Sequence, residues 1–537
     1  MFLRVKSFKN KNGSKRDYLL LVANKKISGK VRQVTVTNFG RVGEANTLID
    51  EIAEKISEYS NKVKFINLST ELKSSWSKEY GPVLIFKKIW EDLGLPGFLE
   101  HYLKKKKITF KAVDIIFSLV LNRLLEPKSE LATHEWVKNV YGLSGVVDTH
   151  QWYRSLDFLI EHKEKIEYDL FAKDMDLFNQ ELDIVLMDTT SVVYWGDGDK
   201  AEKILDYGYS RQKRFDLKQV IVGIFMTKDG IPIGHEVYPG NTNDIKAFKQ
   251  MIVSIKGRYS IRRVIIVCDR GMVSKDNLTQ LRTDGYEYIV GMKMRQLRYE
   301  DAANILDKEN LQTLTENLCA GVVEYEGRRL IVCYNQEQEK RDKAKRVEII
   351  SRLMEKLKTQ GLKSLLVHKE YSKYLKIDAK KPELDEEKIK KEALFDGKFV
   401  LETNTELNWK QVVLSYKDLW QVEHAFRTLK NELAMGPIYH YTEKRIRAHI
   451  FVCFLALLLK VTLQKALKKI DKTLGYSQIL EDIKKKAIKL DIKNSPYVLR
   501  TELQGQSHVA FKAVGLKIPP RIISGALNND KKVVVRL

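Results

Sequence analysis

The stretch 182–195, LDIVLMDTTSVVYW, is an apolar and β-branched run with one carboxylate, Asp188, inside it. Such a composition is typical of a buried β-strand. Two further apolar runs follow, QVIVGIFMT at 219–227 and IPIGHEVYPG at 231–240. The Lys-Asp-Gly sequence at 228–230 between them is a hairpin signal. We therefore expect three consecutive antiparallel strands.

The next segment alternates helices with strands. A helical stretch over 244–257 leads to a buried-type strand, RRVIIVCDRG, with Asp269 at its end. A helix near 275–283 and a strand at 286–292 follow. The order β-β-β-α-β-α-β, with acids on the first and fourth strands, is that of a ribonuclease H-like α/β fold. Those two strands are neighbours in such a fold, so we expect Asp188 and Asp269 to lie close together.

A third carboxylate is expected on a helix further along the chain. The stretch 416–430 reads YKDLWQVEHAFRTLK. A capping box of Asn408 and Gln411 before it and a Gly-Pro pair after it predict one helix over 409–435. At 3.6 residues per turn, one stripe is apolar and should face the core: Leu419, Val422, Phe426, Leu429 and Leu433. A second stripe borders it: Tyr416, Trp420, Glu423, Arg427 and Lys430. An ordinary amphipathic helix with an i,i+4 Glu–Arg pair would show the same pattern.

The segment between the last strand and this helix has its own organisation. Two short strands are expected around Glu326-Gly327, followed by a highly charged helix over 337–358. Sheet character resumes only with GKFVLETN at 397–404. The simplest account is an α+β subdomain inserted into the core.

The composition favours a polyanionic partner. Lys and Arg number 94 and Asp and Glu number 70, which gives a formal net charge of +24. A lysine-rich proteome could produce the same excess without a function. The cysteines have no C-x-x-C spacing, which argues against a zinc site or a disulfide framework and suits a reducing cytoplasm. The longest apolar run, 450–459, has ten residues, so we expect neither a signal peptide nor a membrane span, and a cytoplasmic location.

Three carboxylates brought together without His or Cys ligands form a hard-oxygen site that suits Mg²⁺ or Mn²⁺. Two such ions would clamp the attacking and leaving oxygens of an in-line phosphoryl transfer. Because bound cations keep carboxylates ionised, the acids Asp188, Asp269 and Glu423 would position metal rather than act as an acid/base pair.

These residues resemble a known family. MDTT at 187–190, CDRG at 268–271 and Tyr416-x2-Leu419-x3-Glu423-x6-Lys430 are similar to the DDE transposases of bacterial insertion sequences. The resemblance is to the branch with a Y-x2-R-x3-E-x6-K signature and a β-containing insertion before the last acid. Leu419 stands where that signature has Arg. Arg427, one turn after Glu423, could supply the missing charge.

The resemblance implies a site and a reaction. Asp188, Asp269 and Glu423 would be the catalytic triad and the metal ligands, while Tyr416 and Lys430, with Arg427, would bind DNA. The implied enzyme is a magnesium-dependent endonuclease that cuts double-stranded DNA at the ends of its mobile element. It then joins the freed 3′-OH to target DNA, within a homodimer assembled on DNA.

Two alternatives stay open. A ribonuclease H-like nuclease without strand transfer would share the triad. A transposon-derived DNA-binding protein without catalysis would share the charge, but the presence of all three acids argues against it. Asn241 and Asp244 could brace the site, although a turn and a helix cap explain them as well. His449 is expected to be a satisfied core histidine.

Six regions are expected on these grounds. They are a basic β-hairpin module at 1–46, a helical DNA-binding region at 47–180, the first part of the catalytic core at 181–292, the inserted subdomain at 293–395, the last part of the core with the Glu423 helix at 396–470, and a helical and basic tail at 471–537.

Overall fold

The computed structural model describes most of the chain in two compact units. The described residues are 1–59, 63–67, 72–143, 148–178, 184–197, 202–259, 265–297, 299–307, 311–359, 373–378, 381–484, 486–492, 495–503, 505–524 and 532–536. One unit is Met1–Gly81 with Ile479–His508 and Lys517–Leu537; the other is Pro82–Gln478 with Val509–Leu516. The first residues of two predicted strands, 182–183 and 262–264, lie outside the described residues.

The first unit begins with a three-stranded antiparallel sheet over the region where hairpins were expected. Its strands are β1 (Phe2–Lys9), β2 (Lys15–Ile27) and β3 (Lys30–Arg41). Ser28 and Gly29 both have positive φ, 51° and 77°, as the tight turns that join twisted strands require. Helix α1 (Ala45–Tyr59) follows.

The predictions of a helical region from residue 47 and of a helical tail are both wrong in part. The segment after α1 contains β4 (Val63–Asn67) and β5 (Leu72–Glu79). Their partners come from the other end of the chain, where the tail forms β17 (Lys486–Ile492), β18 (Ser495–Arg500), β19 (Ile522–Ser524) and β20 (Lys532–Arg536). A four-stranded sheet has the order β19-β18-β17-β5, and β20 pairs with β4. Strands that pair across more than 400 residues leave no local signal in either segment.

The second unit opens with helices α3 (Gly81–Asp92), α4 (Leu95–Leu103), α5 (Ala112–Leu125), α6 (Glu130–Trp136), α7 (Thr149–Glu161) and α8 (Lys163–Phe178). Ser129 caps α6 by accepting from the Ala132 backbone N–H. Helix α5 is buried along almost its whole length and packs against α7 and the long helix α18 (Glu443–Ile470). These helices form one apolar layer.

Helix α18 is long and apolar enough to cross a membrane by length and composition. However, 83% of its most apolar 18-residue window is buried inside the structure. It is therefore packed as a core helix.

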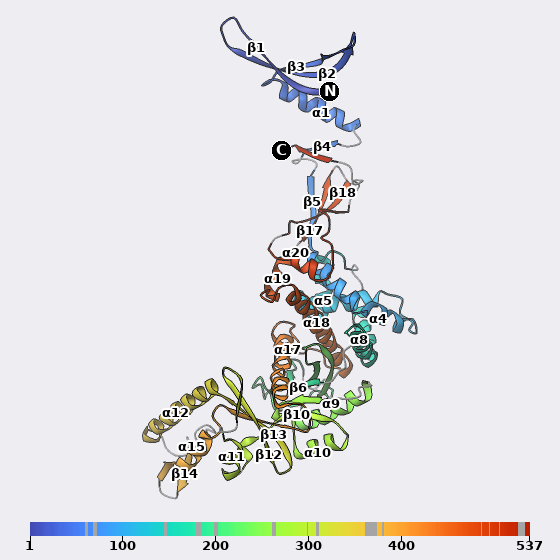
Figure 1. The fold of residues 1–537 in the computed structure, drawn as a ribbon. Helices are drawn as coiled ribbons and strands as arrows, with labels where there is room; N and C mark the ends of the chain where they lie inside the picture. The colour runs from blue at the N-terminus through green and yellow to red at the C-terminus, as the bar shows by residue number, and fades with distance from the viewer. Residues whose placement is uncertain are drawn as a thin grey trace. The chain divides into compact units, whose positions relative to one another are not determined.

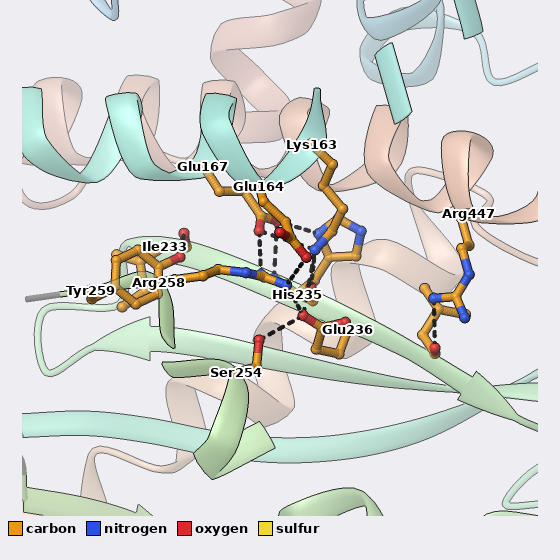
Figure 2. Close-up of polar contacts among 11 residues, drawn as sticks. Lys163, Glu164, Glu167, Ile233, His235, Glu236, Ser254, Arg258, Tyr259 and Arg447 are labelled. Carbon is orange, nitrogen blue, oxygen red and sulfur yellow. Dashed lines mark hydrogen bonds and ion pairs between the residues drawn. The ribbon is translucent and has the colours of Figure 1, made fainter. Parts of the chain in front are cut away.

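A buried ionic cluster fastens α8 to the sheet, as Figure 2 shows; we call it the Glu167 cluster. It consists of Lys163 and Glu167 on α8, His235 and Glu236 on β8 (Pro232–Pro239), and Arg258 at the end of α9 (Asp244–Arg258). The Glu167 carboxylate lies 2.7 Å from His235 Nδ1, 2.7 Å from Arg258 Nη1 and 3.1 Å from Lys163 Nζ. Lys163 also donates to the His235 carbonyl at 2.6 Å. The charges of the Glu167 cluster are therefore paired in a largely buried position.

The centre of the second unit is a nine-stranded mixed sheet (Figure 1). Its first part contains β6 (Ile184–Val193), β7 (Gln219–Thr227), β8, β9 (Ile265–Cys268) and β10 (Glu287–Gly291). The hairpin between β7 and β8 turns at Gly230, whose φ is 76°. β6 pairs antiparallel with β7 and parallel with β9, so the first and fourth strands are neighbours. Helices α9 and α10 (Lys275–Thr283) pack against β7 and β10.

The region expected to be a separate insertion extends this same sheet. β11 (Gln312–Thr315), β12 (Leu318–Tyr325) and β13 (Arg328–Asn335) join it because β13 pairs with β16 (Lys398–Thr403), which pairs with β10. The segment also contains α11 (Tyr299–Ile305), α12 (Gln336–Thr359), β14 (Leu375–Asp378), β15 (Lys381–Leu384) and α15 (Glu386–Ala393). An independent subdomain is therefore the wrong description of β11–β13.

The single helix predicted over 409–435 is two helices, α16 (Trp409–Lys417) and α17 (Trp420–Asn431). The predicted capping box of Asn408 and Gln411 is present. Between the helices the Leu419 and Gln421 amides donate to carbonyls three residues back, so the backbone tightens for one turn. The apolar stripe, which includes Leu419 and Val422, is nevertheless buried as predicted.

Candidate active site

Two adjacent strands place Asp188 and Asp269 at matching positions. Leu186 is paired with Val267, and continuing this parallel register by two residues sets Asp188 beside Asp269. Val185 and Met187 pack with α9 in one core cluster, so Asp188, one position on, faces the opposite side of the sheet. Asp269 follows Cys268, which belongs to that same cluster, and so also points away from α9.

The two later helices cross that opposite side. α16 packs over β9, β10, β12 and β13, and α17 packs over β6 and β7. The Tyr416 hydroxyl at the end of α16 donates to Asp269 Oδ1 at 3.2 Å. Lys430 near the end of α17 is close enough for the Asp188 charge to act on its ammonium. Glu423 lies between Tyr416 and Lys430 in the sequence of the helix pair.

A cavity of about 420 Å³ opens at Asp269 and Glu423, which both line it. Its wall includes the rings of Phe399, Tyr416 and Trp420. The Tyr416 ring is stacked near Phe399, with centroids 6.1 Å apart and planes 24° apart. Trp420 is 57% exposed. This open cavity is where a substrate can reach two of the three predicted acids.

The Asp188 carboxyl group has a strongly raised pKa. Burial raises its pKa to about 6; the guanidinium of Arg211, with Nη1 3.8 Å from Asp188 Oδ2, and the Thr189 backbone N–H oppose the rise. The charges of Asp244 and Asp269 add to it. A carboxyl with neighbouring acids and little water gains from a cation, which makes this a place for a positive ligand.

Two cations border the site. Arg211 lies between Asp188 and Asp244, with Nη2 3.5 Å from Asp244 Oδ2. Burial, with the charge of Arg211, lowers the pKa of Lys430 to about 8, whereas the charge of Asp188 acts in the opposite direction. Burial, with Asp269, raises the pKa of the Tyr416 hydroxyl, which keeps it protonated as a donor. Arg211 and Lys430 thus place two basic side chains beside Asp188.

The side chains proposed for this site suit a divalent metal by type, although the oxygens of the three carboxylates do not all lie within 4.8 Å of one another. Asp188, Asp269 and Glu423 offer carboxylate oxygens only, and the Cys268 thiol is buried in the core on the other side. Among the described residues, the one group of three metal-capable side chains whose ligand atoms all lie within 4.8 Å of one another is elsewhere: Glu130, His440 and His449. There Arg123 already contacts Glu130 and His449, at 3.4 and 3.3 Å. We interpret that group as an internal ion-pair cluster.

The remaining predicted residues divide into those at the site and those away from it. Asp244 accepts from the Thr189 hydroxyl at 2.6 Å and so braces the site; the cap of α9 is Asn243. Asn241 instead bonds Asp206 at 2.7 Å. Arg427 is exposed beyond Glu423 on α17. His449 is buried and bonded to the Met435 carbonyl at 3.1 Å, as a core histidine should be.

Arg211 is the site residue that sequence reasoning missed. It lies in the polar loop between β6 and β7, and its backbone N–H donates to Ser191 Oγ at 3.1 Å. Nothing in the local pattern distinguishes it from Lys213 and Arg214 beside it. Only the fold of the loop back over β6 brings its guanidinium to Asp188.

Two family models match this chain. The family model described as "Transposase DDE domain" matches residues 179–459, more than half of the chain, and the "IS1634 family transposase, N-terminal domain" matches residues 3–69. No curated protein matches. A solved piggyBac transposase synaptic complex with hairpin DNA is similar at 11% identity with a TM-score of 0.36, covering 75% of this chain and 79% of that chain. The chain therefore belongs to the DDE transposases of bacterial insertion sequences.

Proposed function

We propose that this transposase binds the ends of its own insertion sequence, cuts the DNA there and joins the freed 3′ end to a target. The observation that carries the proposal is the arrangement on one side of the sheet: the β6–β9 register sets Asp188 beside Asp269, α16 and α17 pack over that side, and Glu423 lines a cavity with Asp269. The strand order β8-β7-β6-β9-β10 supports assigning this part of the sheet to the ribonuclease H-like class.

In this proposal Asp188, Asp269 and Glu423 hold two Mg²⁺ or Mn²⁺ ions. When bound, such ions activate the attacking oxygen and neutralise charge on the leaving oxygen of a phosphoryl transfer. Tyr416 fixes the orientation of the Asp269 carboxylate through its hydroxyl. Thr189 and Asp244 brace the strand that carries Asp188, and their hydrogen bond is 2.6 Å long.

The basic side chains of α17 would bind the DNA backbone. Lys430, and Arg427 on the exposed side of α17, are positioned to contact phosphates next to the cut. The net charge of +24 supports a large electrostatic share of the affinity. We further propose that the basic sheet at 1–46 and the helices within 47–180 contact the element's ends, and that a homodimer holds two ends together in the bacterial cytoplasm.

The test is cleavage of DNA that carries the inverted repeats flanking the coding region. Asp188→Asn, Asp269→Asn and Glu423→Gln should each abolish cutting while leaving end binding largely intact, because each removes one metal ligand and little else. Asp276→Asn, at an exposed acid on α10, is the charge-matched control and should cut normally. If one of the three variants cuts at the wild-type rate, that residue does not belong to the triad.

The same assay separates the proposal from a nuclease that does not join DNA. A transposase converts pre-cut ends into products covalently linked to target DNA. If the wild-type protein cuts the ends but gives no joined products with a free 3′-OH substrate, the nuclease alternative is correct.

A further inference from the structure

Exposed aromatic side chains of the second unit are concentrated in two segments near the active site. In the described part of Pro82–Gln478, eight aromatic side chains are exposed, and six of them lie in the β6–β7 loop and in the link before α18. We call these six the aromatic surface: Trp195, Tyr207, Tyr209, Phe215, Tyr439 and Tyr441. Tyr209 is the most exposed, at 80%.

The two segments are joined through their backbones although they are far apart in sequence. The Trp195 N–H donates to the Ile438 carbonyl at 2.8 Å, and the Glu202 N–H to the Tyr441 carbonyl at 3.3 Å. Tyr194 and Ile438 form a β-bridge. Trp195, Tyr439 and Tyr441 therefore belong to two segments that are hydrogen-bonded to each other through their backbones.

The loop that carries Tyr207 and Tyr209 is held against the sheet. Asp206 and Gln219 exchange backbone hydrogen bonds of 3.2 and 2.9 Å, and Gln219 Nε2 donates to the Tyr209 carbonyl at 3.2 Å. A side chain at Gly208 would meet the Gly240 carbonyl oxygen at 2.1 Å, so the backbone is in direct contact there. The two tyrosine rings are thus displayed on an anchored backbone.

Cations link the aromatic surface to the active site. The Arg214 guanidinium lies 5.5 Å from the Trp195 ring centroid, and the Tyr209 and Phe215 rings are 6.2 Å apart. Arg211, two residues from Tyr209, reaches Asp188. Trp195 lies seven residues past Asp188 on the same run of chain, about 23 Å at 3.3 Å per residue. That length corresponds to about seven stacked nucleotides.

We propose that the aromatic surface binds unpaired nucleotides of the DNA strand that leaves the active site, with bases stacked on its rings and phosphates facing Arg211 and Lys213. Paired bases keep their faces covered by neighbours, so exposed rings can stack only on bases that are unpaired. This combination of aromatic rings with cations is what single-stranded nucleic acid requires. The inference rests on the proposed function, since it takes the strand at Asp188 to be the one that is cut.

The experiment measures binding of the full-length protein, without metal, to fluorescein-labelled oligothymidylate and to a duplex of equal length. Tyr209→Ala and Tyr439→Ala, one in each segment, should each weaken single-strand binding by roughly fivefold or more, the effect of losing one stacked base. Duplex affinity should change less than about twofold. Tyr209→Phe keeps the ring and should bind as the wild type does. Tyr168→Ala removes an exposed ring from α8 and is the matched control.

Three results would overturn the inference: no single-strand binding by the wild-type protein, unchanged single-strand binding in both alanine variants, or an equal loss for single strand and duplex. Failure of the proposed function looks different. In that case the wild-type protein would bind oligothymidylate through these rings but would not cut DNA carrying the element's ends.

Discussion

Replacing Glu167 by Gln should destabilise the second unit more than any other single charge removal in the Glu167 cluster. The Glu167 side chain is fully buried and shared by Lys163, His235 and Arg258. Gln keeps the shape but removes the charge, so the Lys163 ammonium and the Arg258 guanidinium lose one of the two carboxylates that they share and keep only Glu236. Burial also lowers the pKa of His235, so the ring stays neutral and cannot replace the missing charge.

The size of the expected loss of stability follows from the titration of the Glu167 carboxyl group. Burial opposes ionisation, yet the charges of Lys163 and Arg258, with the hydrogen bond from His235, hold the pKa of Glu167 at about 2 instead of 4.5. A depression of this size corresponds to about 3 kcal/mol of stability. Removing one partner from a buried ion pair typically costs about 3–5 kcal/mol. Because the folded pKa is depressed, this contribution is fully present above about pH 4.5 and is lost as the pH falls toward 2.

Urea unfolding followed by tryptophan fluorescence measures the change, because six of the seven tryptophans lie within Pro82–Gln478. Glu164→Gln is the matched control: Glu164 also pairs with Arg258, at 3.3 Å, but its side chain is 74% exposed. The control should lose less than about 1 kcal/mol. The reasoning is refuted if the two variants unfold at the same urea concentration at pH 7, or if Glu167→Gln loses as much stability as the wild type between pH 4.5 and 2.

Three further outcomes are expected. Tyr416→Phe keeps the ring beside Phe399 but removes the donor to Asp269, so single-turnover cleavage should fall roughly tenfold or more with DNA affinity unchanged; a loss of affinity alone would favour a direct phosphate contact. Arg427→Ala should weaken end binding and reduce the slope of log binding constant against log salt concentration by about one. Arg341→Ala, on the exposed face of α12, is the control and should leave end binding unchanged. If Arg427→Ala loses no affinity, Arg427 does not replace the signature arginine. Wild-type end binding, measured by fluorescence anisotropy, should weaken at least about tenfold between roughly 50 and 200 mM salt; a flat dependence would contradict the phosphate-dominated mode.

The neighbouring acids could be predicted because their signal is local. Asp188 lies within the apolar strand β6 and Asp269 directly follows the apolar strand β9, and the order of strands and helices along the chain makes those strands neighbours. The buried stripe of α17, including Val422 and Phe426, likewise follows from a 3.6-residue period. Hydrophobic periodicity indicates which side of a helix or strand is buried, even when the element that packs against it is not known.

Partners and loop paths could not be predicted in this way. β5 reads LKSSWSKE, a run with little apolar alternation, and it is a strand because β17 supplies hydrogen bonds to it. The break before Leu419 lies inside an unbroken helical pattern. Arg211 is one of several cations in a polar loop, and its role depends on how that loop folds over Ser191. For β5 and for Arg211 the deciding contact is made by a residue distant in the sequence.

The position of the long interruption explains how the third acid can come so late in the chain. The segment after β10 leaves the sheet at one edge, adds β11–β13 there and returns through β16, which pairs with β10 in the same sheet. The interruption therefore widens the sheet without separating β6 from β9. Because α16 starts soon after β16 and packs back over β10 and β9, the chain needs only these two helices to bring Glu423 to the cavity that Asp269 lines. A longer or shorter insertion at this edge would leave that path unchanged, so the spacing between the second and third acids is free to vary while the geometry of the site is conserved.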